Sequence, residues 1–245
     1  MSPTESRVER YRSARAGVLE RIHAASIRAG RDADEVTLLA VSKTVPADAL
    51  RDAVAAGLDR LGENRVQEGL AKAPDVPGAH WQLVGPLQSN KARRALEVFD
   101  SIQTVDSLDL ARRLDRLVPE TRVGSRYPVL IQVNVDLDAS KAGFAPDAIP
   151  GGMSELLALP HLDVRGLMTV GRLTDDPAVA RGTFIALREL SERTRSRWPE
   201  LGPELSMGMS DDFEIAVEEG ATIVRVGRAL FGARPAADVR RARGG

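Results

Sequence analysis

Lys43 is the residue whose type and position most clearly indicate chemistry. It is one of only four lysines among 34 basic residues, the rest being arginine, and it ends the apolar run VTLLAVSK. A guanidinium cannot form an imine with an aldehyde, whereas an amine can once it loses its proton. This makes Lys43 a Schiff-base candidate; the alternative is a solvated lysine that ends a strand.

A second informative stretch is LSMGMSDDFEIAVEEGATIVRVGRALFG, at residues 205–232. Backbone amides at a helix start can hold a phosphate without any lysine, and Ser210 and Gly227 would let one approach closely. The alternative is that Ser210 or Asp211 caps the helix DDFEIAVEE, with Asp211 and Glu214 in capping-box spacing. If a dianion binds here, the neighbouring acidic side chains must point away from it.

These residues need elements that bring them together. Apolar residues recur at three- or four-residue steps over residues 4–29, which predicts a leading amphipathic helix. After it, eight short apolar runs alternate with helical patterns, and strict alternation of this kind indicates a parallel sheet. The expected strands cover residues 36–41, 60–62, 82–84, 101–104, 129–135, 164–168, 204–206 and 223–226.

Eight such units predict an α/β fold, a single (β/α)8 TIM barrel with an extra N-terminal helix. The 245 residues are close to the roughly 250 typical of one such barrel, whose functional groups gather at the C-terminal strand ends. The residues expected there are Lys43, Glu63, Asn64, 85–90, Asn134, Met168, 206–210 and 225–228. An open doubly wound sheet is the rival, but the first turn, SKTVPAD, lacks the glycines that such folds use to bind nucleotides.

Composition narrows the classes of partner. The net charge of −1 gives no electrostatic case for nucleic acid or an acidic membrane surface, and cysteine is absent. The histidines His23, His80 and His161 lack metal-ligand spacing, and no apolar run reaches about 18 residues. We expect a cytoplasmic monomer that binds small molecules. One ligand-binding domain should cover residues 1–235, with a disordered tail at 236–245.

An amine after the first strand, facing a phosphate cradle after the last two, describes a site for pyridoxal 5′-phosphate (PLP). The chain also resembles the pyridoxal-phosphate homeostasis protein family (YggS/PROSC-like), whose fold is that of the N-terminal barrel of alanine racemase. The resemblance covers essentially the whole barrel. The matching stretches are LLAVSKTVPADAL, GENRVQE, HWQLVGPLQSNKAR, QTVDSLDLARRL, VLIQVNVDLDASKAGF, VRGLMTV and LSMGMSDDFEIAVEEGATIVRVGRALFG.

The resemblance implies roles for individual residues. Lys43 would carry the covalent imine, Asn64 would lie beside the ring, and Arg225 would contact the ring nitrogen and keep it unprotonated. The phosphate would be held by Ser210 and the amides around Gly227 and Arg228, with Ser206 also among the cofactor-binding residues. Many relatives have threonine where this chain has Arg228, whose charge could strengthen the contact or whose bulk could turn it outward.

The implied function is to bind, store and deliver PLP in cofactor homeostasis, with PLP-dependent apoenzymes as recipients. The alternative is a PLP-dependent amino-acid racemase of low or narrow activity, but racemisation needs a second acid/base, and both Tyr11 and Tyr127 should lie away from the active face. A barrel that has lost its ligand is a third possibility, which the retained Lys43 disfavours. Lys91 and Lys141 could be transient acceptors or a second phosphate contact, although solvated lysines are the ordinary interpretation of both.

Overall fold

A computed structural model describes residues 3–122, 124, 126–172 and 174–232 of the chain. Eight parallel strands form one closed barrel in the order of the sequence, which confirms the predicted fold. The expected tail at 236–245 lies outside the described residues. The strands are β1 (Thr37–Val41), β2 (Arg60–Glu63), β3 (His80–Leu83), β4 (Ser101–Val105), β5 (Tyr127–Gln132), β6 (Leu162–Met168), β7 (Glu204–Ser206) and β8 (Ile223–Val226).

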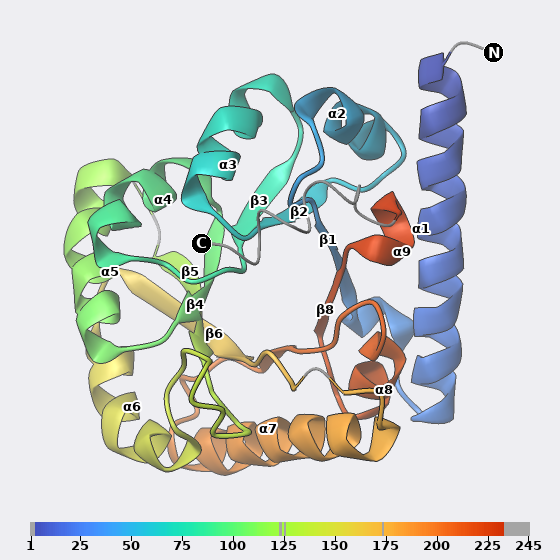
Figure 1. The fold of residues 1–245 in the computed structure, drawn as a ribbon. Coiled ribbons are helices and arrows are strands. Elements are labelled where there is room, and N and C mark those ends of the chain that lie inside the picture. Colours follow the sequence, from blue (N-terminus) through green and yellow to red (C-terminus); the bar gives the residue numbers. More distant parts are fainter. Residues whose placement is uncertain (1–2, 123, 125, 173, 233–245) are drawn as a thin grey trace.

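Helices surround the barrel (Figure 1). They follow the strand-helix alternation expected from the sequence, and short 3-10 turns precede α4 and α6. The α-helices are α1 (Pro3–Arg28), α2 (Ala47–Ala55), α3 (Val66–Lys72), α4 (Ala92–Val98), α5 (Leu108–Thr121), α6 (Ile149–Ala158), α7 (Pro177–Arg197), α8 (Phe213–Glu218) and α9 (Arg228–Phe231). The 3-10 turns are η1 (Ala33–Glu35), η2 (Ala73–Asp75), η3 (Ser89–Lys91) and η4 (Pro146–Ala148).

Side-chain alternation along the strands divides the apolar core in two. One small cluster fills the barrel interior and consists of Leu39, Val84, Leu130, Met168 and Ile223. A much larger cluster occupies the space between barrel and helices. Residues two apart on a strand share a face, so residues that follow the interior cluster by two positions also face the interior.

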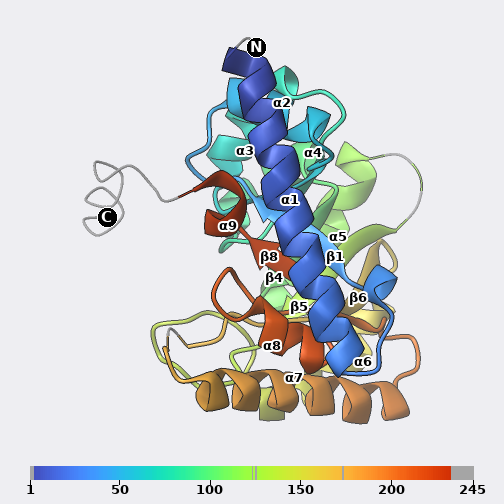
Figure 2. The same cartoon turned by 90° about the vertical axis from the view of Figure 1, so that its right-hand side faces the viewer.

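The leading helix α1 spans the seam of the barrel where the last strand meets the first. It packs against α2, α8 and α9 (Figures 1 and 2). Tyr11, Val18 and Ile22 are buried on its inner face, as the apolar spacing predicted. Tyr11 meets Phe231 of α9 edge to face, with ring centroids 5.6 Å apart. This contact ties the first helix to the end of the described barrel.

The prediction that the fifth strand reaches residue 135 is wrong, because β5 ends at Gln132. The amide of Asn134 donates to the Phe144 carbonyl, and its side chain donates to the carbonyls of Asp138 and Lys141. These bonds turn the chain away from the barrel into a compact loop. Among the described helices, none combines the length and apolar character needed to cross a membrane.

Candidate functional site

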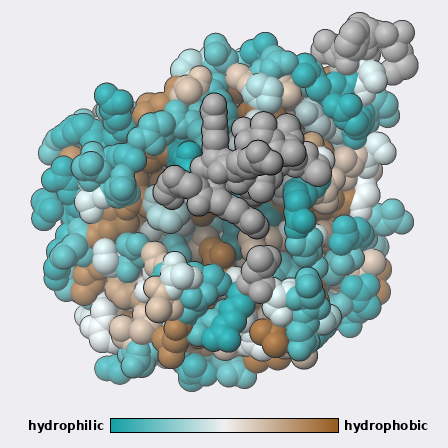
Figure 3. Space-filling view, in the orientation of Figure 1, coloured by the Kyte–Doolittle hydropathy of each residue, from teal (hydrophilic) through white to brown (hydrophobic). Residues whose placement is uncertain are grey.

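The C-terminal strand ends form one mouth of the barrel, which faces the viewer in Figure 1. Figure 2 shows α9, which follows β8, and the loop after β5 on this same side. Lys43 follows β1 and is partly buried, and Asn64 follows β2 on the neighbouring strand. In the space-filling view of Figure 3, hydrophilic residues dominate the rim and hydrophobic residues appear inside it. The structure thus places the predicted site residues at one end of the barrel.

Ser210 and Gly227 come together although they lie in different units of the barrel. The Gly227 N–H donates to Ser210 Oγ at 3.2 Å. A Cβ at position 227 would lie 3.2 Å from the carbonyl oxygen of Val41, so the glycine also allows β8 to approach the end of β1 closely. A hydroxyl and backbone amides therefore meet two residues away from Lys43 along the first strand.

Arg228 begins α9, but its guanidinium is turned toward solvent. It pairs with the Asp211 carboxylate, and more than half of each side chain is exposed. Two outcomes were expected for Arg228, a stronger phosphate contact or a side chain turned outward, and the structure shows the second. A phosphate contact from Arg228 would therefore come from its backbone amide.

The capping-box interpretation of residues 211–214 is wrong. The helix α8 begins at Phe213 with Asp212 as its N-cap, and no side chain caps it. The Asp212 side chain instead accepts a hydrogen bond from the Met209 N–H at 2.6 Å, and Glu214 pairs with Arg21. Ser210 is thus available to the Gly227 amide because it has no role in the helix end.

Arg225 lies inside the barrel on β8 and is only 4% exposed. Its Nη1 donates to Ser206 Oγ at 2.7 Å, and its Nη2 donates to the Thr169 carbonyl at 2.7 Å. Ser206 Oγ in turn donates to Gln103 Oε1 at 2.6 Å. Burial lowers the pKa of Arg225 to about 10, an effect that the Asp212 carboxyl partly opposes, so the guanidinium stays charged near neutral pH.

The partners of Arg225 were not predicted from the sequence. Thr169 and Gln103 join it to β6 and β4, and Gln103 Nε2 extends the chain of hydrogen bonds to Gln82 of β3 at 2.6 Å. A buried guanidinium needs such partners, because an unpaired charge in a dry interior is costly. The signal was present as a glutamine inside the apolar run SIQTV.

Glu63 does not join the mouth, contrary to expectation. It is the last residue of β2, is fully buried, and meets Lys72 of α3 at 2.7 Å on the outer side of the barrel wall.

Asn64 lines an open pocket of about 320 Å³ together with Arg65 and Lys91, among others. Gly85 packs so closely that a Cβ there would lie 2.2 Å from the Asn64 carbonyl oxygen.

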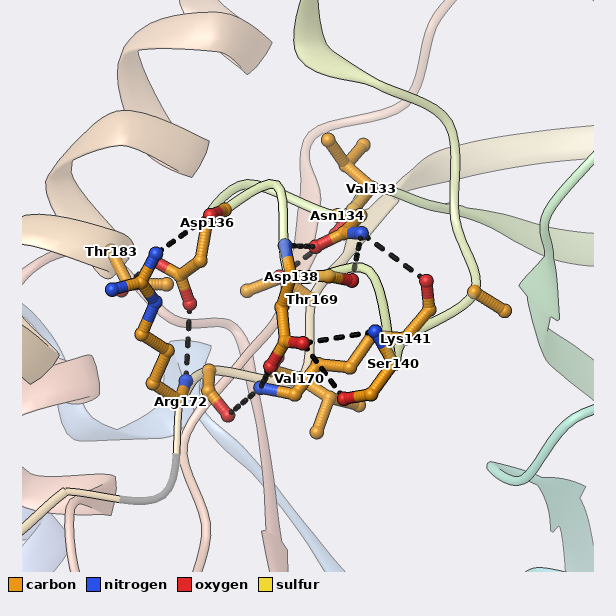
Figure 4. Close-up of polar contacts among 12 residues, drawn as sticks. Val133, Asn134, Asp136, Asp138, Ser140, Lys141, Thr169, Val170, Arg172 and Thr183 are labelled. Carbon is orange, nitrogen blue, oxygen red and sulfur yellow. Dashed lines mark hydrogen bonds and ion pairs between the residues drawn. The ribbon is translucent and has the colours of Figure 1, made fainter.

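Lys141 belongs to the loop at residues 133–145, called here the β5 loop. Its ammonium donates to the carbonyls of Gly171 at 2.8 Å and Val170 at 3.3 Å, and it lies 3.6 Å from the Asp138 carboxylate (Figure 4). Lys141 therefore ties the β5 loop to the loop after β6. These contacts favour a structural role over that of a transient amine acceptor.

A parallel barrel with an amine, a buried guanidinium and a hydroxyl-amide pair at its mouth defines an alanine-racemase-like barrel protein. The sequence model for the family "Alanine racemase, N-terminal domain" matches residues 21–235. This match covers the described barrel and the last eight residues of the leading helix, 21–28.

Individual relatives narrow this class. The pyridoxal phosphate homeostasis protein of Pseudomonas aeruginosa is 46% identical over 224 residues, covering 89% of this chain and 94% of that protein. The protein of the same name from Escherichia coli K12 is 41% identical over 230 residues, with the same coverage. The chain belongs to the pyridoxal phosphate homeostasis protein family.

A solved structure agrees with this assignment. PipY of Synechococcus elongatus PCC7942, determined with PLP bound, is 43% identical and superposes with a TM-score of 0.76. The similarity covers 88% of this chain and all of that protein. At 43% identity the two proteins are similar in sequence as well as in fold.

Proposed function

We propose that this protein binds PLP and acts in its homeostasis, storing and delivering the cofactor through a Schiff base at Lys43. The observation that supports the proposal is that Gly227, whose amide donates to Ser210, packs closely on Val41, two residues before Lys43, at the seam of β1 and β8. The relatives named for PLP homeostasis and the PLP-bound PipY support it.

The described residues fit each part of this ligand. Gly227 leaves room beside the Val41 carbonyl, and with Ser210 and the Arg228 amide it would hold the phosphate. A guanidinium has five N–H donors, and two bonds of Arg225 go to Ser206 and Thr169; a further N–H of Arg225 would donate to the ring nitrogen. Asn64 would lie beside the ring, and Ser206 would hold Arg225 in place through their hydrogen bond.

Lys43 would form its bond without any oxidant or reductant. Its deprotonated Nζ would condense with the aldehyde, so that a carbon–nitrogen double bond replaces the carbon–oxygen double bond and the oxygen leaves as water. An amine of a recipient apoenzyme would then replace Nζ at the same carbon and return Lys43 as a free amine. Because one imine replaces another, release has little net cost.

Racemisation is the second candidate, and the positions of the tyrosines disfavour it. Tyr127 opens β5 at the far end of the barrel, where its buried hydroxyl donates to the Phe99 carbonyl at 2.7 Å. Tyr11 is buried in α1. Since a general base must reach the proton that it abstracts, neither can serve as the second acid/base at the mouth.

We further infer that the protein acts as a cytoplasmic monomer.

Borohydride reduction tests the proposal directly. After incubation with PLP and reduction, peptide mass analysis should find one pyridoxyl adduct, on the peptide that contains Lys43. The Lys43→Ala variant should lose this adduct. An adduct of equal yield on Lys91 or Lys141 in the unaltered protein would contradict the assignment of Lys43, and the absence of any adduct would contradict the proposed function.

A further inference from the structure

A buried ionic cluster lies directly behind Lys43, on the outer side of the barrel wall. Its members are Ser42, Glu63, Glu68 and Lys72, called here the Lys72 cluster. The Lys72 ammonium donates to Glu63 Oε1 at 2.7 Å, to the Ser42 carbonyl at 3.1 Å and to Glu68 Oε2 at 3.3 Å. Ser42 Oγ also donates to Glu63 Oε1, at 2.8 Å. The Lys72 side chain is 13% exposed and that of Glu63 is 0% exposed.

The cluster holds both peptide groups of Lys43. The carbonyl of Ser42, which forms the peptide bond before Lys43, accepts from Lys72. The amide of Thr44, which forms the peptide bond after Lys43, donates to Glu68 Oε2 at 3.3 Å. Because Lys72 also contacts Glu68, one ammonium connects the two attachment points. The direction in which the Lys43 side chain leaves the backbone is therefore set by this cluster.

The backbone at this point needs such support. Thr44 has φ of 67°, a left-handed conformation that is strained for a β-branched residue. The turn is closed by a hydrogen bond from the Val45 N–H to the Ser42 carbonyl at 3.0 Å. Glycine is the usual residue at such a position. Strain of this kind persists only where surrounding contacts enforce it, and the Glu68 contact to the Thr44 amide does so.

The chemistry of Lys72 explains why this position also keeps a lysine in an arginine-rich chain. A compact ammonium can direct three donors to three separate acceptors, as Lys72 does. A planar guanidinium is suited to bidentate contact with one carboxylate and would not reproduce this arrangement. The rarity of lysine that singled out Lys43 thus applies to Lys72 as well.

We infer that Lys72, with Glu63 and Glu68, is a positioning residue that presents the Lys43 amine in the geometry required for the Schiff base. This inference rests on the proposed function, because it concerns the same amine. Lys72 itself pairs with Glu63 on the outer side of the barrel wall and is assigned no contact with PLP. Its effect on the bond would act through the two peptide groups that flank Lys43.

Two ligands separate positioning from general support. PLP can form the Schiff base, whereas pyridoxine 5′-phosphate carries an alcohol in place of the aldehyde and cannot. The ratio of their affinities, together with the imine absorbance and the borohydride adduct, isolates the contribution of the covalent bond. The variants are Lys72→Met and Glu68→Ala, with Glu68→Gln as the conservative replacement that keeps an acceptor for the Thr44 amide.

Arg188→Met is the matched control. Arg188 of α7 bonds at 2.8 Å to Glu219, which precedes the first residue of β8 and so lies toward the end of the barrel opposite Lys43. Glu68→Ala serves if Lys72→Met does not fold, because the Glu68 side chain is 27% exposed and its loss leaves the Lys72–Glu63 pair intact.

In Lys72→Met and Glu68→Ala, the affinity for PLP divided by the affinity for pyridoxine 5′-phosphate should fall about 10-fold or more. A small misplacement of a reacting group has effects of this size. Glu68→Gln and Arg188→Met should keep the ratio of the unaltered protein. An unchanged ratio in Lys72→Met and Glu68→Ala would overturn the inference, and so would an equal loss of affinity for both ligands. If the unaltered protein itself forms no adduct on Lys43, the proposed function fails first.

Discussion

Two sides of the barrel mouth use a lysine to fix the chain, and they do so in different surroundings. On the β1–β2 side, Lys72 is enclosed behind the wall with Glu63, which is fully buried. On the β5–β6 side, Lys141 is 22% exposed and its partner Asp138 is 31% exposed. Lys72 thus has one partner that is completely removed from water, whereas Lys141 is held mainly by two carbonyls and its carboxylate partner is partly exposed.

Solvent access decides how much each ion pair contributes to stability. Loss of one partner from a buried pair leaves a charge that nothing hydrates, whereas water replaces a partner lost at the surface. The β5 loop also has further anchors. Asp136 accepts from Thr183 Oγ1 at 2.7 Å and from the Arg172 amide at 3.1 Å, so Lys141 is one contact among several (Figure 4).

Lys72→Met should give the largest loss of stability in this comparison. It leaves Glu63 buried without its cation, and breaking a buried pair in this way costs about 3–5 kcal/mol. The free energy of unfolding from chemical denaturation measures the loss. Arg188→Met is the control and should cost clearly less, because the Arg188 side chain is 34% exposed and Glu219 keeps its pair with Arg181. Equal losses in the two variants would show that burial does not govern the stability of these pairs.

The pH dependence of stability should identify Glu63 as the member of the Lys72 cluster whose pKa is raised by burial. Burial raises the pKa of Glu63, and Lys72 and Ser42 offset this only in part. Its Oε2 has no hydrogen-bond partner among the described residues. Glu68 behaves differently, because the Thr44 amide and Lys72 outweigh its partial burial and hold its pKa below the ordinary value.

A raised pKa in the folded state means that the folded protein binds this proton more tightly than the unfolded chain does. As the pH falls from neutral toward the ordinary value of 4.5, the unaltered protein should therefore gain stability relative to Glu63→Gln, which cannot titrate. The gain is lost as the pH rises through the folded-state pKa. Thermal unfolding of both proteins across this range measures the difference. If the stabilities of the two proteins changed in parallel with pH, the raised pKa of Glu63 would be contradicted.

The parts of this site that depend on strand order could be predicted from the sequence, and those that depend on side-chain direction could not. In a parallel barrel every strand ends at the same mouth, so the strand-end positions of Lys43, Ser210 and Gly227 were sufficient to bring them to one place. The face on which Glu63 leaves β2 was not visible in the pattern, because a strand buried on both sides shows no alternation.

The end of β5 shows a second limit. The run VLIQVNV has the composition of a longer strand, and nothing local marks where it stops. The stop comes from Asn134, whose side chain bonds to backbone groups that follow it by four and seven residues. These hydrogen bonds exist only once the β5 loop has folded. The strand propensity of the run carries no information about them, so it does not predict where the strand ends.

Lys141→Met should have the smallest effect. Its hydrogen bonds to Val170 and Gly171 are partly accessible to water, so the midpoint of thermal unfolding should fall by no more than about 2–4 °C. The local effect should be clearer: amide hydrogen exchange should accelerate in the β5 loop and stay unchanged at the end of β1. The Asp136 contacts keep the loop anchored to α7 even then. Faster exchange at the end of β1 would show that the two sides of the mouth are coupled, and the distinction between them would then fail.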